Sequence, residues 1–249
     1  MEKTTLHEGF CISINAMKPL RRYMHRTFER AVEQNLANIL GLIERDPNAV
    51  LLDCGCDDGA LTRRFAAKAE TTKVHGIEIN PAGIAGAAGN GINAEPADLN
   101  GRLPFDDGSF DVVSANQIIE HLHNTEMFLD EIYRVLKKGG YALISTENLA
   151  SWHNIAALLM GWQPFSLTNV SARYLGIGNP LALHRGKSIS HEAWQHLRVF
   201  SFRGLKELFE LKGFRVEKLL GAGYFPLPGF FAAVDPRHAA FLTAKIRKA

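Results

Sequence analysis

The segment "IIEHLHN" contains three side chains that can exchange protons within four consecutive positions: Glu120, His121 and His123. Imidazoles and carboxylates are common general acids and bases in enzymes, and an imidazole titrates near neutral pH. His121 with Glu120 is therefore the first candidate for a catalytic base. The structural alternative is that both residues stabilise a loop or cap the helix that follows. So short a cluster does not by itself predict a metal site.

Two cysteines lie one residue apart in "LLDCGCDDG", beside Asp53 and Asp57. A zinc site would need a second pair of cysteines or histidines, and none accompanies Cys54 and Cys56 at a fitting distance. The third cysteine of the chain is Cys11, and so small and odd a number argues against a disulfide framework and for a reducing compartment. We expect Cys54 to point into the core, and we expect no metal.

The same segment has glycines at Gly55 and Gly59, just before an expected helix. Glycines let a ligand approach the backbone, and the first turn of a helix offers free N–H groups. The spacing G-x-x-x-G differs from the G-x-G-x-x-G of dinucleotide-binding loops. Asp53, before the first glycine, suits a ligand with an ammonium group. Glu78 in "GIEIN", 25 residues further on, can accept both hydroxyls of a ribose.

These residues lie at the ends of predicted strands that alternate with helices. Short apolar runs predict strands, and longer runs with apolar residues at helical spacing predict helices. The expected strands span 49–55, 73–80, 92–95, 110–116 and 141–147, and the expected helices span 60–70, 81–91 and 124–140. Such alternation predicts a doubly wound α/β fold with a parallel sheet, in which ligands bind beyond the carboxyl ends of the strands.

Two flanks complete the chain of 249 residues, a length that suits one large α/β domain. A helix over 15–46 is expected to form an N-terminal cap. A helix over 201–213, capped by Ser201, and strands over 214–223 and 238–248 are expected to complete the sheet. The predicted divisions are the cap (1–48), the ligand-binding core (49–148), an insertion (149–196) and the C-terminal part (197–249).

The insertion is rich in tryptophan, glycine, proline and leucine and nearly free of charge. We expect a helix followed by an irregular segment that forms a lid over the substrate site. Its large apolar residues Trp152, Trp162 and Phe165 either form the lid's own small core, or line an apolar pocket or a surface that touches lipid.

Charge is spread unevenly, although the whole chain carries only +2. Residues 49–148 carry −7 and residues 197–249 carry +6. The basic part, residues 197–249, either forms a solvated surface or attracts an anionic substrate or a membrane surface. Apolar runs are too short to span a membrane, and "MEKTTLHEGF" lacks the pattern of a signal peptide, so we expect a cytoplasmic protein.

The motifs occur together and in order. The run "PADLNGRLPFDDGSFDVVSANQIIEHLHNTEMFLDEIYRVLKKGGYALIST", after "LDCGCDDGALT" and "GIEIN", resembles the small-molecule branch of class I S-adenosylmethionine-dependent methyltransferases, the type 11 or UbiE/UbiG-like group. The resemblance is close over 49–148 and loose over 197–249. It implies a Rossmann-like sheet of seven strands in the order 3-2-1-4-5-7-6 with the last strand antiparallel. It also implies S-adenosylmethionine (SAM) as methyl donor and S-adenosyl-L-homocysteine as product.

By position, the resemblance implies cofactor contacts for a set of residues at the strand ends: Asp53, Gly55, Cys56, Asp57, Gly59, Glu78, Ile79, Asp98, Leu99, Asn116 and Gln117. Asp53 and the loop from Gly55 to Gly59 would hold the methionine moiety. Asn116 and Gln117 would lie near the transferred methyl group.

The adenosine part of the cofactor would lie along the next strands. Glu78 would bind the ribose hydroxyls, Ile79 would pack on the adenine, and Asp98 would accept from its amino group beside the Leu99 backbone. Asp57 departs from the family pattern, because many relatives have glycine there. Its carboxylate either tightens the loop or weakens cofactor binding.

Methyl transfer asks a protein to align the acceptor with the methyl group, to exclude water and, where needed, to remove a proton. The candidate substrate residues are His123, Trp152, His153, His196 and Arg198. For His196 and Arg198, the alternative is that they tie the insertion to the sheet. A lid of this composition favours a bulky, partly apolar small molecule that is lipid-, quinone- or sugar-like. Oxygen is the favoured acceptor atom, with nitrogen and carbon as alternatives.

Two other functions stay open. An RNA methyltransferase would be expected to carry a basic-aromatic patch, and methylases of exocyclic amines carry Asn-Pro-Pro-aromatic where "SANQ" stands here. A non-catalytic SAM-binding protein is disfavoured by the intact loop and acidic positions. The expected partners are thus a small-molecule acceptor, no nucleic acid, and a membrane surface at most peripherally.

Overall fold

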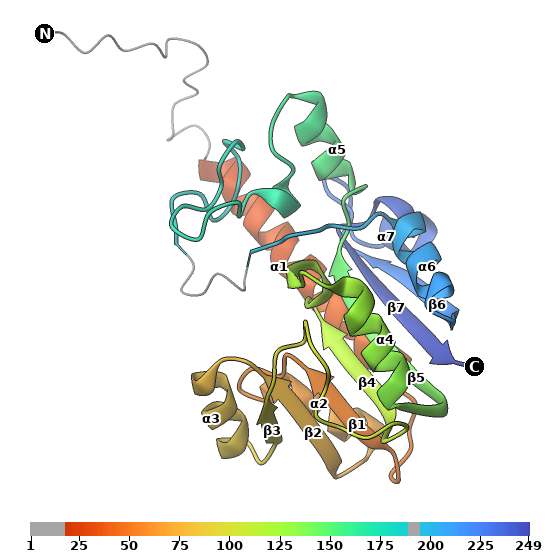
Figure 1. Cartoon of the computed structure of the whole chain (residues 1–249). Helices are drawn as coiled ribbons and strands as arrows, with labels where there is room; N and C mark the ends of the chain where they lie inside the picture. The colour runs from red at the N-terminus through yellow and green to blue at the C-terminus, as the bar shows by residue number, and fades with distance from the viewer. Residues whose placement is uncertain (1–17, 189–194) are drawn as a thin grey trace, which may run out of the picture.

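The computed structural model describes residues 18–188 and 195–249, so the predictions about Cys11 and the first ten residues lie outside the described part. Seven strands form one sheet in the order β3-β2-β1-β4-β5-β7-β6 (Figure 1). The strands are β1 (Val50–Cys54), β2 (Lys73–Glu78), β3 (Asn93–Pro96), β4 (Phe110–Asn116), β5 (Leu136–Glu147), β6 (Phe214–Ala222) and β7 (Phe241–Lys248). β7 is antiparallel to β5 and β6, and the other neighbours are parallel. The predicted strand order and orientation are confirmed.

Helices cover both faces of the sheet. They are α1 (Lys18–Leu42), α2 (Ala60–Ala69), α3 (Pro81–Gly89), α4 (Thr125–Val135), α5 (Trp152–Leu159), α6 (Phe202–Leu211) and α7 (Phe231–Val234), with 3-10 turns η1 (Ile119–His121), η2 (Phe165–Leu167) and η4 (Pro236–His238). Successive strand residues point to opposite faces. Leu51 accordingly packs with Ile39 of α1 and Phe65 of α2, whereas Leu52 lies in the cluster of Phe128 of α4 and Phe209 of α6.

The predicted helix over 124–140 is wrong at its end, because α4 stops at Val135 and β5 begins at Leu136. Leu136 has extended dihedral angles, is fully buried and pairs with Phe110 of β4. Burial of a leucine side chain contributes about 2 kcal/mol, which outweighs the helix propensity of the two lysines that follow. Gly139 therefore lies within β5 rather than at a helix end.

The C-terminal elements are confirmed with one shift. Ser201 caps α6, since its Oγ accepts from Gly204 N at 3.4 Å. The last strand starts at Phe241 instead of residue 238. The chain first makes the turn η4, in which Asp235 Oδ2 lies 2.6 Å from His238 Nδ1.

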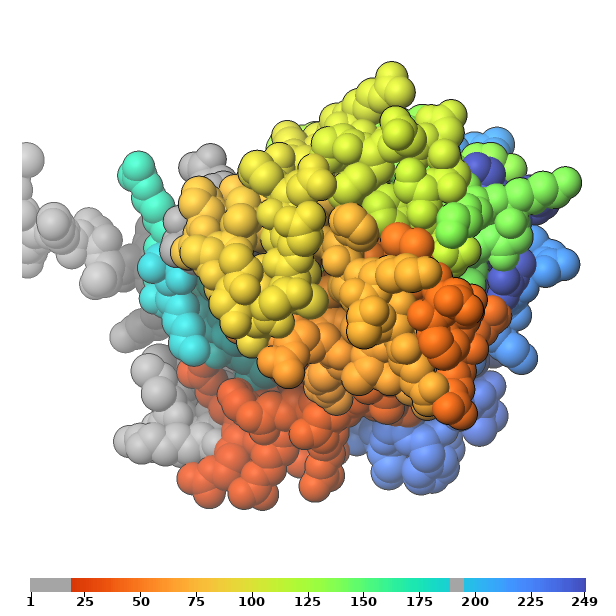
Figure 2. All heavy atoms as spheres, turned by 90° about the horizontal axis from the view of Figure 1, so that it is seen from below, coloured from red at the N-terminus to blue at the C-terminus, as the bar shows by residue number. Residues whose placement is uncertain are grey.

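The insertion consists of α5, η2 and then turns up to Ser188, and it leans on α1. Arg21 of α1 donates from Nη2 to Leu183 O at 3.3 Å, and the rings of Phe28 and His184 meet edge-on with centroids 6.4 Å apart. Seen from below, the red α1 and the teal insertion lie beside the orange and yellow segments of the sheet's first half (Figure 2). In the described ranges, every helix is too short or too polar to cross a bilayer.

Candidate functional site

A groove of about 620 Å³ lies beyond the carboxyl ends of β1, β2 and β4. It is called the groove below. Its lining includes residues that the resemblance assigns to the cofactor: Gly55, Asp57, Glu78, Ile79, Asp98, Leu99, Asn116 and Gln117. His121 and His123 also line it, His123 at the exposed rim. The fold thus gathers predicted residues from the ends of β1, β2, β3 and β4 into one hollow.

Asp57, where the resemblance implies glycine in many relatives, has a backbone conformation typical of glycine. Its φ is 46°, in the left-handed region, as are the φ angles of Gly55 (75°) and Gly59 (77°). Aspartate is among the few residues with a side chain that tolerate this region. The turn aims the Asp57 N–H at Glu78, whose Oε2 accepts it at 3.1 Å. The loop therefore contributes a backbone donor at Asp57 as well as a carboxylate.

Glu78 is held in place by backbone amides. Its Oε1 accepts from Ile79 N and Asn80 N, both at 2.8 Å, and its Oε2 accepts from Asp57 N. A carboxylate has about four acceptor sites, so Oε2 keeps room for a further donor. Ile79 beside it is 51% exposed, an apolar shelf at the groove edge. A fixed acid, an apolar shelf and a second acid at Asp98 fit the ribose and adenine of the cofactor that the sequence implies.

Three residues predicted to contact the cofactor do not line the groove: Asp53, Cys56 and Gly59. Asp53 is 3% exposed, and its Oδ2 accepts from Thr62 Oγ1 at 2.6 Å. Burial raises the pKa of Asp53 to about 6. Gly59 packs against Ala87, so closely that a Cβ would lie 3.2 Å from the Ala87 backbone. These residues shape the loop from behind the groove, and their contact with the cofactor stays a prediction.

The two cysteines are core residues. Cys54 is fully buried in the main apolar cluster, as predicted, and Cys56 packs with Ala87 and Ile92. Burial raises the pKa of Cys56 to about 12, and it raises that of Cys54 as well. Both therefore remain thiols at neutral pH, whereas metal binding and redox reactivity require a thiolate.

Glu120 does not line the groove and is fully buried. Its Oε2 accepts from Thr146 Oγ1 at 3.0 Å, and the Gln117 amide, turned so that both ends find partners, donates to Oε1 at 3.1 Å. The Glu120 carbonyl accepts from Leu197 N and Arg198 N. Burial raises the pKa of the Glu120 carboxyl to about 8, with the Glu147 charge adding to the effect. A carboxyl that is protonated at pH 7 is a poor base, and this geometry favours the structural alternative.

His121 lines the groove as a neutral imidazole. Its Nδ1 lies 3.0 Å from Gln195 O. A carbonyl only accepts, so Nδ1 carries the proton and Nε2 keeps a lone pair. Burial, and the neighbouring His196, lower the pKa of His121 to about 4. It can accept a hydrogen bond, but it is a weak base.

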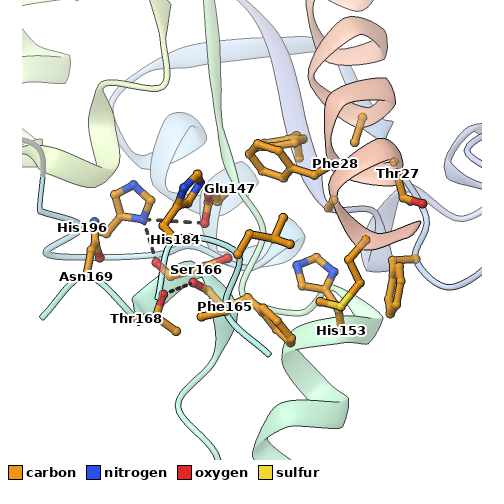
Figure 3. Close-up of a pocket in the computed structure, with 18 of the residues that line it drawn as sticks. Thr27, Phe28, Glu147, His153, Phe165, Ser166, Thr168, Asn169, His184 and His196 are labelled. Atoms are coloured by element: carbon orange, nitrogen blue, oxygen red, sulfur yellow. Dashed lines mark hydrogen bonds and ion pairs between the residues drawn. The ribbon is translucent and has the colours of Figure 1, made fainter. Parts of the chain in front are cut away.

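A second hollow of about 310 Å³, called the cavity below, lies between α1, the insertion and the loop after β6 (Figure 3). Most of its lining is apolar or aromatic: Met24, Phe28, Ala31, Phe165, Leu175, Ala182, Leu183, Tyr224, Phe225, Ala240 and Phe241. His153 and His196, two predicted substrate residues, line it too. Burial lowers the pKa of His153 to about 4, so it is neutral at pH 7.

Two other predicted substrate residues point elsewhere. Trp152 donates from Nε1 to Tyr224 Oη at 2.8 Å and stacks on His238, so it stands behind the cavity wall and forms no closed core within the insertion. Arg198 donates from Nη1 to Thr125 Oγ1 at 3.0 Å, which fixes the start of α4. For Arg198, this contact fits the alternative that it ties the insertion to the sheet.

One short segment separates the groove from the cavity. Gln195 and Leu197 line the groove, whereas His196 between them lines the cavity. The rings of His196 and His121 lie 4.8 Å apart, centroid to centroid. His121 and residues 195–197 are called the shared wall below. Through it, the cavity adjoins the groove.

The shared wall also brings together groups of metal-binding type. Within the described part of the chain, Glu120, His121 and His196 each bring one ligand atom within 4.8 Å of the others. A metal ligand must be an ionised carboxylate, whereas burial keeps the Glu120 carboxyl protonated and Thr146 and Gln117 occupy its oxygens. The arrangement fits a hydrogen-bonded network better than a metal centre.

Sequence reasoning missed two residues of this region. Glu147, the last residue of β5, lines the cavity 3.6 Å from His196 Nδ1. An acid at the carboxyl end of a strand was a usable signal for it. Asn35 of α1 donates to Asn116 Oδ1 at 3.1 Å, under the groove. No local pattern distinguishes Asn35 from other polar residues of an amphipathic helix.

Comparison with known proteins gives one consistent result. A family model described as a methyltransferase domain matches residues 20–219. The malonyl-[acyl-carrier protein] O-methyltransferase of Erwinia billingiae is 28% identical over 190 residues, which are 76% of this chain and 72% of that protein. The mitochondrial ubiquinone biosynthesis O-methyltransferase of Rattus norvegicus is 26% identical over 193 residues, 73% of this chain and 48% of that protein.

Solved structures share the fold at low sequence identity. A complex of the Haloferax volcanii Trm112 methyltransferase activator with a methyltransferase includes a chain that superposes with a TM-score of 0.62 at 15% identity, over 94% of this chain and 97% of that one. At such identity the likeness concerns the fold alone.

Proposed function

The chain belongs to the SAM-dependent methyltransferases, and from that premise we propose that it methylates an oxygen atom of a small, partly apolar acceptor. The observation that carries the proposal is the meeting of the groove and the cavity at one thin wall. A donor in the groove and an acceptor in the cavity would lie near each other, and direct transfer further requires the side chains of the wall to part so that the two meet. Both curated relatives described above are named O-methyltransferases, which supports oxygen as the accepting atom.

In the proposal, the groove holds the cofactor. Glu78 binds the ribose hydroxyls through the free position on Oε2, Ile79 packs on the adenine, and Asp98 accepts from its amino group. The loop from Gly55 to Gly59 holds the methionine part. When bound, SAM supplies a methyl group on a positively charged sulfur, which makes the transfer a direct displacement.

The protein's contribution is orientation and the exclusion of water. Asn116 Oδ1 accepts from Asn35 Nδ2 and from Ser145 Oγ (2.6 Å), so its side chain is fixed from two sides. α1, which supplies Asn35, also supplies Met24, Phe28 and other wall residues of the cavity. α1 thus supports a groove residue and also lines the cavity, which supports a reaction between the ligands that the two hollows would bind.

Isothermal titration calorimetry with SAM tests the cofactor part. Glu78→Ala removes a charged hydrogen-bond acceptor worth about 1.5–3 kcal/mol, so the affinity should fall about 10- to 100-fold. Glu95→Ala is the matched control, because Glu95 lies on the adjacent strand β3 and does not line the groove. Undiminished affinity of Glu78→Ala would contradict the assignment. SAM binding without transfer to any small acceptor would favour the alternatives, an RNA methyltransferase or a non-catalytic SAM-binding protein.

A further inference from the structure

A third hollow, rich in positive charge, lies on α1 beside the insertion. It has a volume of about 430 Å³ and is called the basic hollow below. α1 supplies most of its lining, and the insertion supplies Leu183; the lining residues are Arg21, Arg22, His25, Arg26, Glu29 and Leu183. Residues four positions apart in a helix are neighbours on its surface. One short stretch of α1 therefore presents three guanidinium groups to the same hollow.

The positive charge of the basic hollow is largely unpaired. Arginine stays charged at physiological pH. Within residues 18–188 and 195–249, the exposed side chains of Arg22 and Arg26 form no hydrogen bond or ion pair. Glu29, the acid of the lining, lies 3.3 Å from His25 through Oε1 and Nδ1. Like charges four positions apart repel each other, so an anion bound between Arg22 and Arg26 would relieve their repulsion.

The basic hollow adjoins the cavity at Leu183. This residue lines both hollows, and its carbonyl accepts from Arg21 Nη2 at 3.3 Å. His184, the next residue, lines the cavity and meets the ring of Phe28, which also belongs to the cavity lining. Cations therefore lie on one side of Leu183, and a mostly apolar surface lies on the other.

The two hollows suit different parts of one ligand. Among the described residues that line the cavity there is no lysine or arginine, and the lining includes an acid, Glu147. An anionic group inside the cavity would lack a counter-charge, which is costly in an apolar site. An apolar group is stabilised there by its removal from water. An anionic group is favoured in the basic hollow instead, where Arg22 and Arg26 can pair with it.

We propose that the basic hollow binds a phosphate group of the methyl acceptor, whose apolar body occupies the cavity. This inference rests on the proposed function. A guanidinium group offers parallel N–H donors that match phosphate oxygens. A phosphate monoester carries about 1.5–2 negative charges at pH 7, which the unpaired charges of Arg22 and Arg26 can balance. A carboxylate would leave one of these two charges unmatched. The acceptor class is therefore an apolar molecule with a phosphate at one end.

Isothermal titration calorimetry with octyl phosphate, a soluble compound of this class, tests the proposal on the full chain. Octanol and octyltrimethylammonium lack the negative charge, and octanoate carries only one. Each should bind at least about tenfold more weakly than octyl phosphate, since charge-assisted hydrogen bonds are lost. Added salt should weaken the binding of octyl phosphate more than that of octanol. Failure of octyl phosphate to bind overturns the proposal, and equal binding of octanoate overturns the choice of phosphate.

Substitutions on α1 test the residues. The double variant Arg22→Gln/Arg26→Gln should bind octyl phosphate at least about tenfold more weakly and octanol within about threefold of the wild type. Glu29→Gln removes a negative charge from the lining and should tighten octyl phosphate binding. Arg30→Gln is the matched control, because Arg30 is an exposed arginine of α1 that lines neither hollow. Unchanged octyl phosphate affinity in the double variant overturns the basic hollow as the phosphate site.

Chain length tests whether the cavity takes the apolar body. Burial of the additional methylene groups should make octyl phosphate bind at least about 100-fold more tightly than ethyl phosphate. Ala182→Phe would fill part of the cavity, since Ala182 is buried in its lining, and should remove most of this difference while ethyl phosphate binding stays unchanged. If that variant does not fold, Thr27→Leu, at a half-buried lining position of α1, should reduce the difference. Equal affinities of the two phosphates for the wild type would overturn the link between the hollows.

A lipid surface is a second source of phosphate groups. Vesicles of phosphatidylcholine with and without phosphatidylglycerol separate the two sources by sedimentation. Binding to the anionic vesicles through Arg22 and Arg26, without binding of octyl phosphate, would show a membrane contact and overturn the acceptor site. Calorimetry with SAM keeps the proposed function apart, because Arg22→Gln/Arg26→Gln should leave SAM affinity unchanged. Failure of the wild type to bind SAM, with the octyl phosphate results as expected, would contradict the proposed function and not the phosphate site.

Discussion

The groove and the cavity share a wall, but the surroundings of their acidic residues are opposite in kind. In the groove, the acid Glu78 is surrounded by backbone donors and remains open to solvent at the rim. In the cavity, the acid Glu147 stands among aromatic and aliphatic side chains beside neutral imidazoles. The first arrangement suits a ligand that forms hydrogen bonds. The second surrounds one carboxyl group mostly with apolar side chains.

The two hollows also differ in their origin along the chain. The groove is built from strand ends and the loops between them, all within residues 55–123 except for Gln195 and Leu197. The cavity joins α1, the insertion and the C-terminal part. Because the two hollows are built largely from different parts of the chain, a change in one should leave the other intact. The predictions below test that independence.

The largest effect is expected for Gly55→Ala. A Cβ at Gly55 would lie 2.2 Å from Ile118 Cδ1, and the φ of 75° is unfavourable for alanine. Strain and overpacking together should cost about 2–4 kcal/mol of stability and lower SAM affinity at least about 100-fold. Urea unfolding measures the stability, and calorimetry measures the SAM affinity.

Gly91→Ala is the control for that change. Gly91 has a φ of 76°, yet nothing lies within 4 Å of its added Cβ. It should lose only the about 1–2 kcal/mol of backbone strain and keep its SAM affinity. Equal loss of SAM affinity in both variants would contradict the close contact with Ile118 as the cause.

Glu120→Gln tests whether Glu120, which lies beside the shared wall, is protonated at neutral pH. Burial raises the pKa of Glu120 to about 8 from its usual value near 4.5, so the folded state holds the proton more tightly than the unfolded state. Stability should fall as pH rises from about 4.5 to 8, and glutamine, which does not ionise, should remove this dependence. We expect a gain of about 3 kcal/mol in unfolding free energy at pH 7, measured by urea unfolding across this range.

Glu131→Gln should behave in the opposite way. Arg134 lowers the pKa of Glu131, so its pair contributes stability above the usual carboxyl pKa and loses it as pH falls. The variant should therefore be less stable at pH 7 and approach the wild type in acid. A stability loss at pH 7 in Glu120→Gln would show that Glu120 is ionised in the folded protein.

Asn35→Ala tests the support that α1, which lines the cavity, gives to Asn116 of the groove. Asn35 donates to Asn116 and Ser145, and it accepts from Thr243 Oγ1 at 2.8 Å. Leaving these partners unsatisfied should cost about 2 kcal/mol and slow turnover, while SAM affinity changes less than about threefold. Asn38→Ala, one turn further along α1 and bonded to Gly221 O, should lose stability but not turnover. Equal loss of turnover in both would remove Asn35 from the site.

Asp57→Gly gives the smallest effect. Relief of the left-handed conformation is offset by the greater freedom of glycine in the unfolded chain, so stability should change by less than about 1 kcal/mol. The carboxylate is exposed, and SAM affinity should change less than about fivefold. Asp57→Asn separates charge from backbone, since asparagine also tolerates this conformation. A tenfold loss in both variants would make the carboxylate a direct ligand of the cofactor.

The sequence predicted the groove better than the cavity for a physical reason. Glu78 and Asn116 end a strand and Asp98 follows one, and neighbouring parallel strands end at one edge, so position along the chain already implies proximity. Glu147 also ends a strand, but its partner His196 arrives from 49 positions further on, through a segment without regular pattern. Local reasoning has no means of pairing them.

Burial explains the remaining differences. Asp53 and Glu120 have the right types in the right places for chemistry, yet side-chain alternation and the turn η1 direct them inward. Leu136 shows the same effect for secondary structure, since its contact with Phe110 ends α4 before the lysines. In each case the contact that decides the outcome is made by a residue distant in sequence.

The hydrogen bond from Thr243 to Asn35 joins the first described helix to the last strand across 208 positions. During synthesis, α1 leaves the ribosome long before β7, so Asn35 cannot accept from Thr243 until β7 has been made. The glycine loop and its strands can assemble earlier, whereas the support beneath Asn116 is completed last. A nascent chain could therefore hold cofactor before it is able to react, which separates the timing of binding from the timing of activity.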